Sequence, residues 1–320
     1  MKRASTNETI NISFVLPLEI IDLIISKTEN KVIDLCQVCH YFNNNCKILR
    51  ITDNKNYISI SNEILLTLTN ITALNLRHNY QITTETIFRL PKLIKLDLSD
   101  NVVIMDIPSN IESLKLKKNT TINNIDHLTR LVRLDLDGNC NITNKATSSL
   151  PSLTKLNISN NLIITDEGLG VNLRKLNLTF NYTVTDKGIS KLTNLTSLNL
   201  SFNQNITDIS NLSNLTHLNL MFNHRITDIS NLTDLTFLDL TNNHQITDRQ
   251  ISGLSKLTTL RIRDQNLITD RGISELTNLT ILDIFNDIEG SLDPRLLYLK
   301  RNNPITMEGL KNLTKLKMYK

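Results

Sequence analysis

Side chains able to bind a metal gather near the N-terminus. Cys36 and Cys39 have the i, i+3 spacing at which two thiolates on one helical face can share a zinc ion, and His40 and Cys46 follow closely. A closed zinc site needs a second pair of ligands at the proper spacing, and the sequence offers none there. We therefore predict that these cysteines pack within a small helical unit and that the chain binds no metal.

Other residues that could do chemistry are isolated. His224 and His244 occupy equivalent places in successive copies of a repeated motif, so we expect them on neighbouring turns about 5 Å apart, exposed and without a carboxylate partner. The sequence contains neither a G-x-S-x-G nucleophile motif nor a phosphate-binding glycine loop. Its eight glycines also leave few places for strained active-site backbone. The sequence predicts no enzyme and no cofactor.

The motif that arranges these residues is L-x-x-L-x-L-x-x-N, which recurs through most of the chain with a period of about 20 residues. Such a period indicates stacked units, each of which buries its apolar face against its neighbours. We call the final asparagine the ladder position. The ladder positions are Asn54, Asn79, Asn101, Asn119, Asn139, Asn161, Asn181, Asn203, Asn223, Asn243 and Asn302, with Gln265 and Asp287 in two further repeats.

The repeat also predicts its own local structure. Side chains alternate within L-x-L, so the leucines point inward and the x residues point out from one face of a strand. Successive strands pair in parallel and form a curved sheet, while the ladder asparagine bonds backbone groups of adjacent turns. Repeats of 22 residues carry a glycine and predict a short helical turn, with Thr185 as an N-cap beside Asp186. Repeats of 20 residues predict an extended or 3₁₀ return path, as at Thr207 to Leu212.

This pattern resembles the leucine-rich-repeat family over roughly residues 46–320, in forms similar to internalin-type and F-box-associated repeats. The expected fold class is α/β, a leucine-rich-repeat solenoid of about 13 repeats with a curved parallel sheet, irregular at both ends. The first repeat, at Cys46 to Asn54, is degenerate. At the other end we expect a repeat formed by Pro294, Leu297, Leu299 and Asn302, then a final half repeat of Leu313, Leu316 and Met318.

The segment before the repeats has a different character. Residues 1–12 are polar, and we expect them to be disordered. The spacing of apolar residues in 13–45 predicts a compact helical segment. The pattern L-P-x-E-I-I, followed by V-C-x-x-F, resembles the F-box motif over about residues 13–50. The resemblance implies docking on the adaptor subunit of cullin–RING ubiquitin ligases; the alternative is that the segment only caps the first repeat. The implied adaptor-binding residues are Leu16, Pro17, Glu19, Ile20, Ile24, Leu35, Val38, Cys39 and Phe42.

Aromatic residues, only 4% of the chain, cluster on the expected concave face. Phe180, Phe202 and Phe222 each directly precede a ladder asparagine in three successive repeats. Two interpretations stay open: the three rings stack as a structural spine, or they anchor a protein target. The candidate target-binding residues are Phe180, Phe202, His217, Met221, Phe222 and Phe237.

Charge and hydropathy limit the partners and the compartment. The net charge of +4 is mild and basic residues alternate with acidic ones, so no nucleic-acid partner is expected. No apolar stretch is long enough to span a membrane, and no signal peptide is evident. We expect a cytoplasmic or nuclear protein that is not secreted.

The F-box resemblance implies the substrate-recognition subunit of a cullin–RING (SCF-type) ubiquitin ligase, with the target held on the concave face. The alternative is a free-standing leucine-rich-repeat binding protein. Repeat proteins of this Asn- and Ile-rich type are similar to those of giant amoebal DNA viruses, which implies a host protein as the target.

Overall fold

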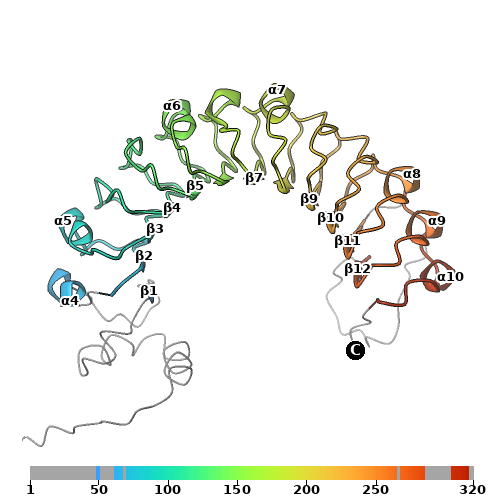
Figure 1. Cartoon of the computed structure of the whole chain (residues 1–320), viewed down its shortest axis with the longest axis horizontal. Coiled ribbons are helices and arrows are strands. Elements are labelled where there is room, and N and C mark those ends of the chain that lie inside the picture. The colour runs from blue at the N-terminus through green and yellow to red at the C-terminus, as the bar shows by residue number, and fades with distance from the viewer. Residues whose placement is uncertain (1–47, 51–60, 68–69, 265–266, 285–303, 317–320) are drawn as a thin grey trace, which may run out of the picture.

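The chain curves into an arc of stacked turns, with strands along the inner side and helical segments along the outer side (Figure 1). The computed structural model describes residues 48–50, 61–67, 70–264, 267–284 and 304–316. The predicted curved parallel sheet is confirmed. We call its inner face the concave face and the side of the helical segments the convex side.

The described part of the sheet has 12 parallel strands in sequence order. The central residue of each strand is a leucine that pairs in register with the central leucine of the next, as Leu218 does with Leu238. The degenerate first repeat follows the same rule, since Leu49 pairs with Leu74. The strands are β1 (Ile48–Arg50), β2 (Ala73–Asn75), β3 (Lys95–Asp97), β4 (Ser113–Lys115), β5 (Arg133–Asp135), β6 (Lys155–Asn157), β7 (Lys175–Asn177), β8 (Ser197–Asn199), β9 (His217–Asn219), β10 (Phe237–Asp239), β11 (Thr259–Arg261) and β12 (Ile281–Asp283).

Short helical turns alternate with extended segments on the convex side. The 20-residue repeat that contains Thr207 to Leu212 returns without a helix, as predicted. A glycine is not required for a helical turn, because buried Thr86 and Ala146 occupy its place in two of them. The turns are α4 (Asn62–Thr67), α5 (Thr84–Phe88), α6 (Asn144–Ser148), the 3₁₀ turn η1 (Asp166–Gly168), α7 (Asp186–Ile189), α8 (Asp248–Ile251), α9 (Asp270–Ile273) and α10 (Met307–Leu310).

The predicted N-cap role of Thr185 needs correction. Thr185 stands at the N-cap position of α7, but its side chain makes no cap hydrogen bond. Its hydroxyl instead donates to Oδ2 of Asp166 at 2.6 Å, and its N–H donates to Oδ1 of the same carboxylate at 2.8 Å. The Thr-Asp pair therefore joins the turns η1, α7, α8 and α9 each to the next repeat, a contact between turns that a local capping rule does not foresee.

The ladder asparagines from Asn101 to Asn243 are buried, and their side chains are hydrogen-bonded to the backbone. Asn203 is 0% exposed, and its Nδ2 donates to the carbonyls of Leu178 and Asn181 at 3.4 and 2.7 Å. Its Oδ1 accepts from the N–H groups of Asn205 and Ile206, each at 3.0 Å. A buried amide without partners would be costly, so this arrangement both requires asparagine and joins two adjacent turns.

The C-terminal end contains extra chain length. Thr306 donates its N–H to Oδ1 of Asp270 at 2.6 Å across 36 residues, whereas the equivalent bond from Thr269 to Asp248 spans 21. Helix α10 therefore packs directly beside α9 on the convex side (Figure 1). The repeat predicted at Pro294 to Asn302 lies outside the described residues. Leu313 and Leu316, from the predicted half repeat, pack on the core.

Two other groups of predictions fall before the described residues. All nine candidate adaptor-binding residues, from Leu16 to Phe42, lie there, as do Cys36, Cys39, His40 and Cys46. Within the ranges that the structure describes, no helix has the length and apolar character needed to cross a membrane.

Candidate functional site

The floor of the concave face is made by short polar side chains that bond to their own strand. In β6, Oδ1 of Asn157 accepts from the backbone N–H and the hydroxyl of Ser159 at 3.1 and 2.7 Å. Asn177 with Thr179, and Asn199 with Ser201, repeat these bonds in β7 and β8. These asparagines are therefore structural. Sequence reasoning left them as free x positions, although Asn or Asp recurs four residues before most ladder positions.

Phe180, Phe202 and Phe222 form the aromatic stack. Ring centroids of Phe180 and Phe202 are 4.4 Å apart with an interplanar angle of 16°, and those of Phe202 and Phe222 are 4.6 Å apart at 14°. This confirms that the three rings lie side by side. Their spacing is that of stacked rings, an arrangement worth about 0.5–1.5 kcal/mol per pair beyond area burial.

The aromatic stack stands on left-handed backbone. Phe180, Phe202 and Phe222 have φ values of 52°, 54° and 52°. This conformation costs a residue with a Cβ about 1–2 kcal/mol and is unusual for a bulky side chain. Other repeats fill the same position with residues better suited to it, such as Asn160, Asn242 and Gly138. Phenylalanine at this strained position in three successive repeats indicates that the rings serve a purpose other than stability, such as binding.

Two further apolar side chains extend the aromatic stack toward the rim of the arc. Tyr182 and Leu162 each follow a ladder asparagine and are 53% and 67% exposed, while Phe180 is 38% exposed. We call the aromatic stack together with Tyr182 and Leu162 the aromatic rim. Exposed apolar side chains gathered in successive repeats mark an interaction surface. Sequence reasoning missed Tyr182 and Leu162. Their signal was an apolar residue directly after the ladder asparagine, a position at which Tyr80 and Val102 also stand.

The remaining candidate target-binding residues lie elsewhere. His217 and Phe237 begin β9 and β10, at the ends of the strands opposite to the aromatic stack, with ring centroids 6.0 Å apart. The guanidinium of Arg261 lies 5.3 Å from the centroid of the Phe237 ring. Met221 is partly buried and directly precedes Phe222. Five of the six candidates thus form two aromatic groups, separated by the polar floor.

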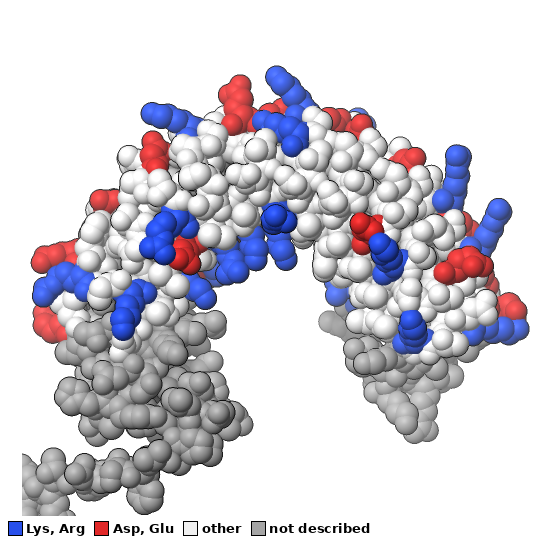
Figure 2. Space-filling view, viewed as in Figure 1, with Lys and Arg blue, Asp and Glu red and all other residues white. Residues whose placement is uncertain are grey.

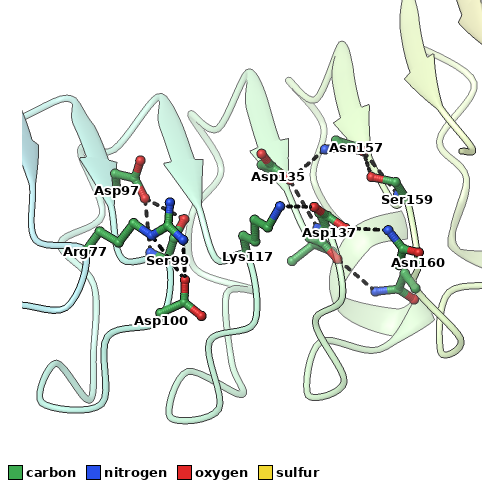
Figure 3. A network of polar contacts seen from close by, with 12 residues as sticks. Arg77, Asp97, Ser99, Asp100, Lys117, Asp135, Asp137, Asn157, Ser159 and Asn160 are labelled. Atoms are coloured by element: carbon green, nitrogen blue, oxygen red, sulfur yellow. Dashed lines mark hydrogen bonds and ion pairs between the residues drawn. The ribbon is translucent and has the colours of Figure 1, made fainter.

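Some charged side chains on the concave face around β2–β6 form ion pairs and hydrogen bonds with one another (Figure 3). The guanidinium of Arg77 is 3.0 Å from Asp100, and the ammonium of Lys117 is 2.6 Å from Asp137. The hydrogen bond that Lys117 donates to Asp137 is the main cause that raises the pKa of Lys117. Burial is the main cause that raises the pKa of Asp135, which also accepts a hydrogen bond from Asn157 at 2.8 Å.

A row of cations at the start of three adjacent strands is not neutralised. Arg133, Lys155 and Lys175 are register partners on β5, β6 and β7, and we call them the basic column. Among the residues that the structure describes, none of the three has an acidic side chain at ion-pair distance. Figure 2 shows Lys and Arg side chains gathered on the inner side of the arc below its middle.

Metal-binding geometry is not apparent in the described ranges. His224 and His244 lie as predicted on neighbouring turns, with ring centroids 5.8 Å apart and parallel planes. Across those ranges no three His, Cys, Asp or Glu side chains come together in a way that could hold a metal ion. Cys140 is an exposed free thiol.

Comparison with known proteins agrees with the geometry of the repeats. The family model described as Leucine Rich repeat matches residues 149–170, 171–192, 191–209 and 211–229. The fold is a leucine-rich-repeat solenoid, as predicted. No curated protein matches the sequence.

Solved structures share this fold. An internalin (inlF) from Listeria monocytogenes has 23% identity and a TM-score of 0.53, over 90% of this chain and 93% of that chain. A chain of the mouse RP105/MD-1 complex has 20% identity and a TM-score of 0.52, over 75% of this chain and 47% of that chain. At these identities the likeness concerns the fold alone.

Proposed function

We propose that the chain is a non-enzymatic protein-binding scaffold that holds a protein partner on its concave face, at the aromatic rim. The observation that carries this proposal is the aromatic stack, in which three phenylalanines occupy left-handed positions that polar residues or glycine fill in the other described repeats. Aromatic anchors commonly supply much of the binding energy at protein interfaces. The exposed Tyr182 and Leu162 beside the stack widen the apolar surface offered to a partner.

The finer proposal concerns what the scaffold is attached to. We propose that it is the substrate-recognition subunit of a cullin–RING (SCF-type) ubiquitin ligase and that the partner, a host protein if the chain is viral, is its substrate. The support is the F-box resemblance of residues 13–50, in which Leu16 and Pro17 match the first docking residues. The order of that segment before a repeat solenoid is the order found in F-box/leucine-rich-repeat proteins.

A site-specific crosslink tests the scaffold proposal. A photo-crosslinking amino acid replaces Tyr182 on the aromatic rim or, as the matched control, exposed Lys187 on α7 of the same repeat. We expect a protein crosslinked from Tyr182 and not from Lys187. That protein is then identified, purified and titrated against the wild-type chain and Phe180→Asn. Equal binding to both chains would refute a partner site at the aromatic rim.

A pull-down tests the ligase proposal separately. We expect the wild-type chain to recover the adaptor and cullin from eukaryotic cells, and Leu16→Ala/Pro17→Ala to lose them. A double substitution in the N-terminal tail, Thr6→Ala/Asn7→Ala, is the control and should behave as wild type. If the wild-type chain recovers neither subunit, or Leu16→Ala/Pro17→Ala recovers them equally well, the free-standing binding protein is the better description.

A further inference from the structure

The basic column contrasts with the charges around it. Lys115 and Lys117, on the neighbouring strand β4 and just after it, lie 3.3 and 2.6 Å from Asp97 and Asp137. Arg133, Lys155 and Lys175 have no such partners in the described part of the chain. Lys115 and Lys117 are thus neutralised, whereas the three adjacent cations at the start of β5–β7 are not.

The three cations are also crowded. Register partners on adjacent parallel strands lie about 4.8 Å apart along the sheet, so Lys155 stands directly between Arg133 and Lys175. The charge of Arg133 is the main cause that lowers the pKa of Lys155, and Lys175 adds to the effect. An anion bound at this place would relieve the repulsion between like charges.

The basic column and the aromatic rim face each other across the floor. Lys175 begins β7 and Phe180 follows its end, so the two side chains are at most about 17 Å apart along the strand. The floor between them carries Asn157, Asn177 and Asn199, whose amide oxygens accept hydrogen bonds from their own segments. A partner crossing this floor meets uncharged side chains until it reaches the cations.

We propose that the basic column binds the carboxylates of an acidic segment of a protein partner, whose apolar side chains rest on the aromatic rim. This inference rests on the proposed scaffold function and adds the chemistry of the partner. Alternate side chains of an extended segment are about 7 Å apart, and the flexible stems of Lys155 and Lys175 can meet two such carboxylates. Charge complementarity of this kind also speeds the encounter of the two proteins.

The aromatic stack favours a protein over a single-stranded nucleic acid. Nucleic-acid sites of that kind stack bases on the open faces of aromatic rings. Here both faces of the Phe202 ring are covered by Phe180 and Phe222, at centroid distances of 4.4 and 4.6 Å. Only ring edges and the ends of the stack are open, and these suit aliphatic or aromatic side chains of a protein.

Peptide titrations test the proposal. The probes are a labelled peptide of alternating Glu and Leu, the same peptide with Gln for Glu, and an oligouridylate of equal charge. We expect the wild-type chain to prefer the Glu peptide, and Lys155→Gln/Lys175→Gln to weaken its binding about tenfold, with a smaller effect at high salt. Lys187→Gln, which changes an exposed lysine on the convex side of the same repeat, is the control and should bind as wild type.

Several results would overturn the acidic segment. These are no binding of the Glu peptide to the wild-type chain, equal binding of the Gln peptide, equal losses in Lys155→Gln/Lys175→Gln and Lys187→Gln, or tighter binding of the oligouridylate. The crosslinked partner separates this failure from a failure of the scaffold proposal. If Phe180→Asn weakens that partner and the double lysine variant does not, only the acidic segment is wrong. If neither variant weakens it, the scaffold site itself is wrong.

Discussion

Gly272 lies so close to Asp248 that a Cβ at residue 272 would stand 2.3 Å from Oδ1 of that carboxylate. The carboxylate cannot easily move, because it accepts the N–H and the hydroxyl of Thr269 at 2.7 and 2.6 Å. Gly188 and Asp166 repeat the relationship at 2.2 Å. The aspartate of one repeat is therefore held by the threonine and accommodated by the glycine of the next.

Gly272→Ala should destabilise the solenoid. The new methyl group overlaps both the carboxylate and the Cα of Asp248, which is 3.0 Å away, so backbone has to shift at a cost of about 1–3 kcal/mol. The measurement is the free energy of unfolding in urea. Gly253→Ala is the matched control, since nothing lies within 4 Å of its Cβ; it should be neutral or stabilise by about 0.5 kcal/mol. Equal effects of the two substitutions would contradict the clash.

Asn203→Ala should lower the free energy of unfolding more than a substitution of an exposed asparagine does. It leaves the N–H groups of Asn205 and Ile206 and the carbonyls of Leu178 and Asn181 without the bonds that Asn203 supplies. Buried and unsatisfied groups of this kind cost about 1–3 kcal/mol each, so we expect a loss of at least about 2 kcal/mol in urea unfolding.

Asn214→Ala provides the comparison for the ladder. Asn214 is exposed and bonds only the carbonyl of Thr193, at 2.9 Å, so its removal should change the stability by less than about 0.5 kcal/mol. If Asn203→Ala were as mild as Asn214→Ala, the ladder asparagines would not be what joins the turns.

Periodicity in the sequence was sufficient to predict the sheet, the ladder and the side-by-side phenylalanines. Each follows from a local rule applied at a fixed period, so Leu218, Asn203 and Phe202 could be placed without coordinates. Contacts between repeats could not be predicted in this way. The bond from Thr185 to Asp166 and the crowding of Lys155 by Arg133 depend on which side chains meet across turns. The exposure of Leu162 likewise became visible only in three dimensions.

Asp135 and Asp137 should give stability opposite dependences on pH. Burial raises the pKa of Asp135 in the folded chain, so this group penalises folding above that pKa, and the penalty disappears as the pH falls below the usual Asp value of about 3.9. Asp135→Asn should therefore stabilise the chain at neutral pH, with no gain in acid. The substitution keeps an oxygen that can accept the N–H of Asp137, as Asn157 does for Ser159 in the next strand.

Asp137→Asn is the opposing variant. Burial works against its carboxylate, but hydrogen bonds from Lys117 and Asn160 prevail and lower its pKa. The group therefore contributes stability above the usual Asp pKa, and that contribution is lost as the pH falls through the lowered value. Asp137→Asn should reduce the urea midpoint at neutral pH and approach the wild type in strong acid. Parallel shifts of the two variants across the pH range would contradict the assignment.

Asparagine substitutions should separate the two interpretations of the aromatic stack. Asparagine already fills the same left-handed position at Asn160 and Asn242, so it relieves backbone strain while removing the ring. Phe180 stacks on one ring and Phe202 on two, at about 0.5–1.5 kcal/mol for each stack. For a binding patch, relief of strain offsets most of this loss. The free energy of unfolding of Phe180→Asn should then lie within about 1 kcal/mol of the wild-type value, and that of Phe202→Asn should be somewhat lower.

Binding gives the second half of this test. If the stack is a binding patch, the affinity of both variants for the partner crosslinked from Tyr182 should fall about tenfold or more, because each variant removes an aromatic anchor from the aromatic rim. Asn160→Ala, one repeat earlier in the same column, is the control and should keep the partner. A structural spine predicts the reverse, a loss of several kcal/mol in stability for Phe202→Asn together with unchanged affinity of the chain that remains folded. The two outcomes differ in both measurements, so one protein preparation of each variant decides between them.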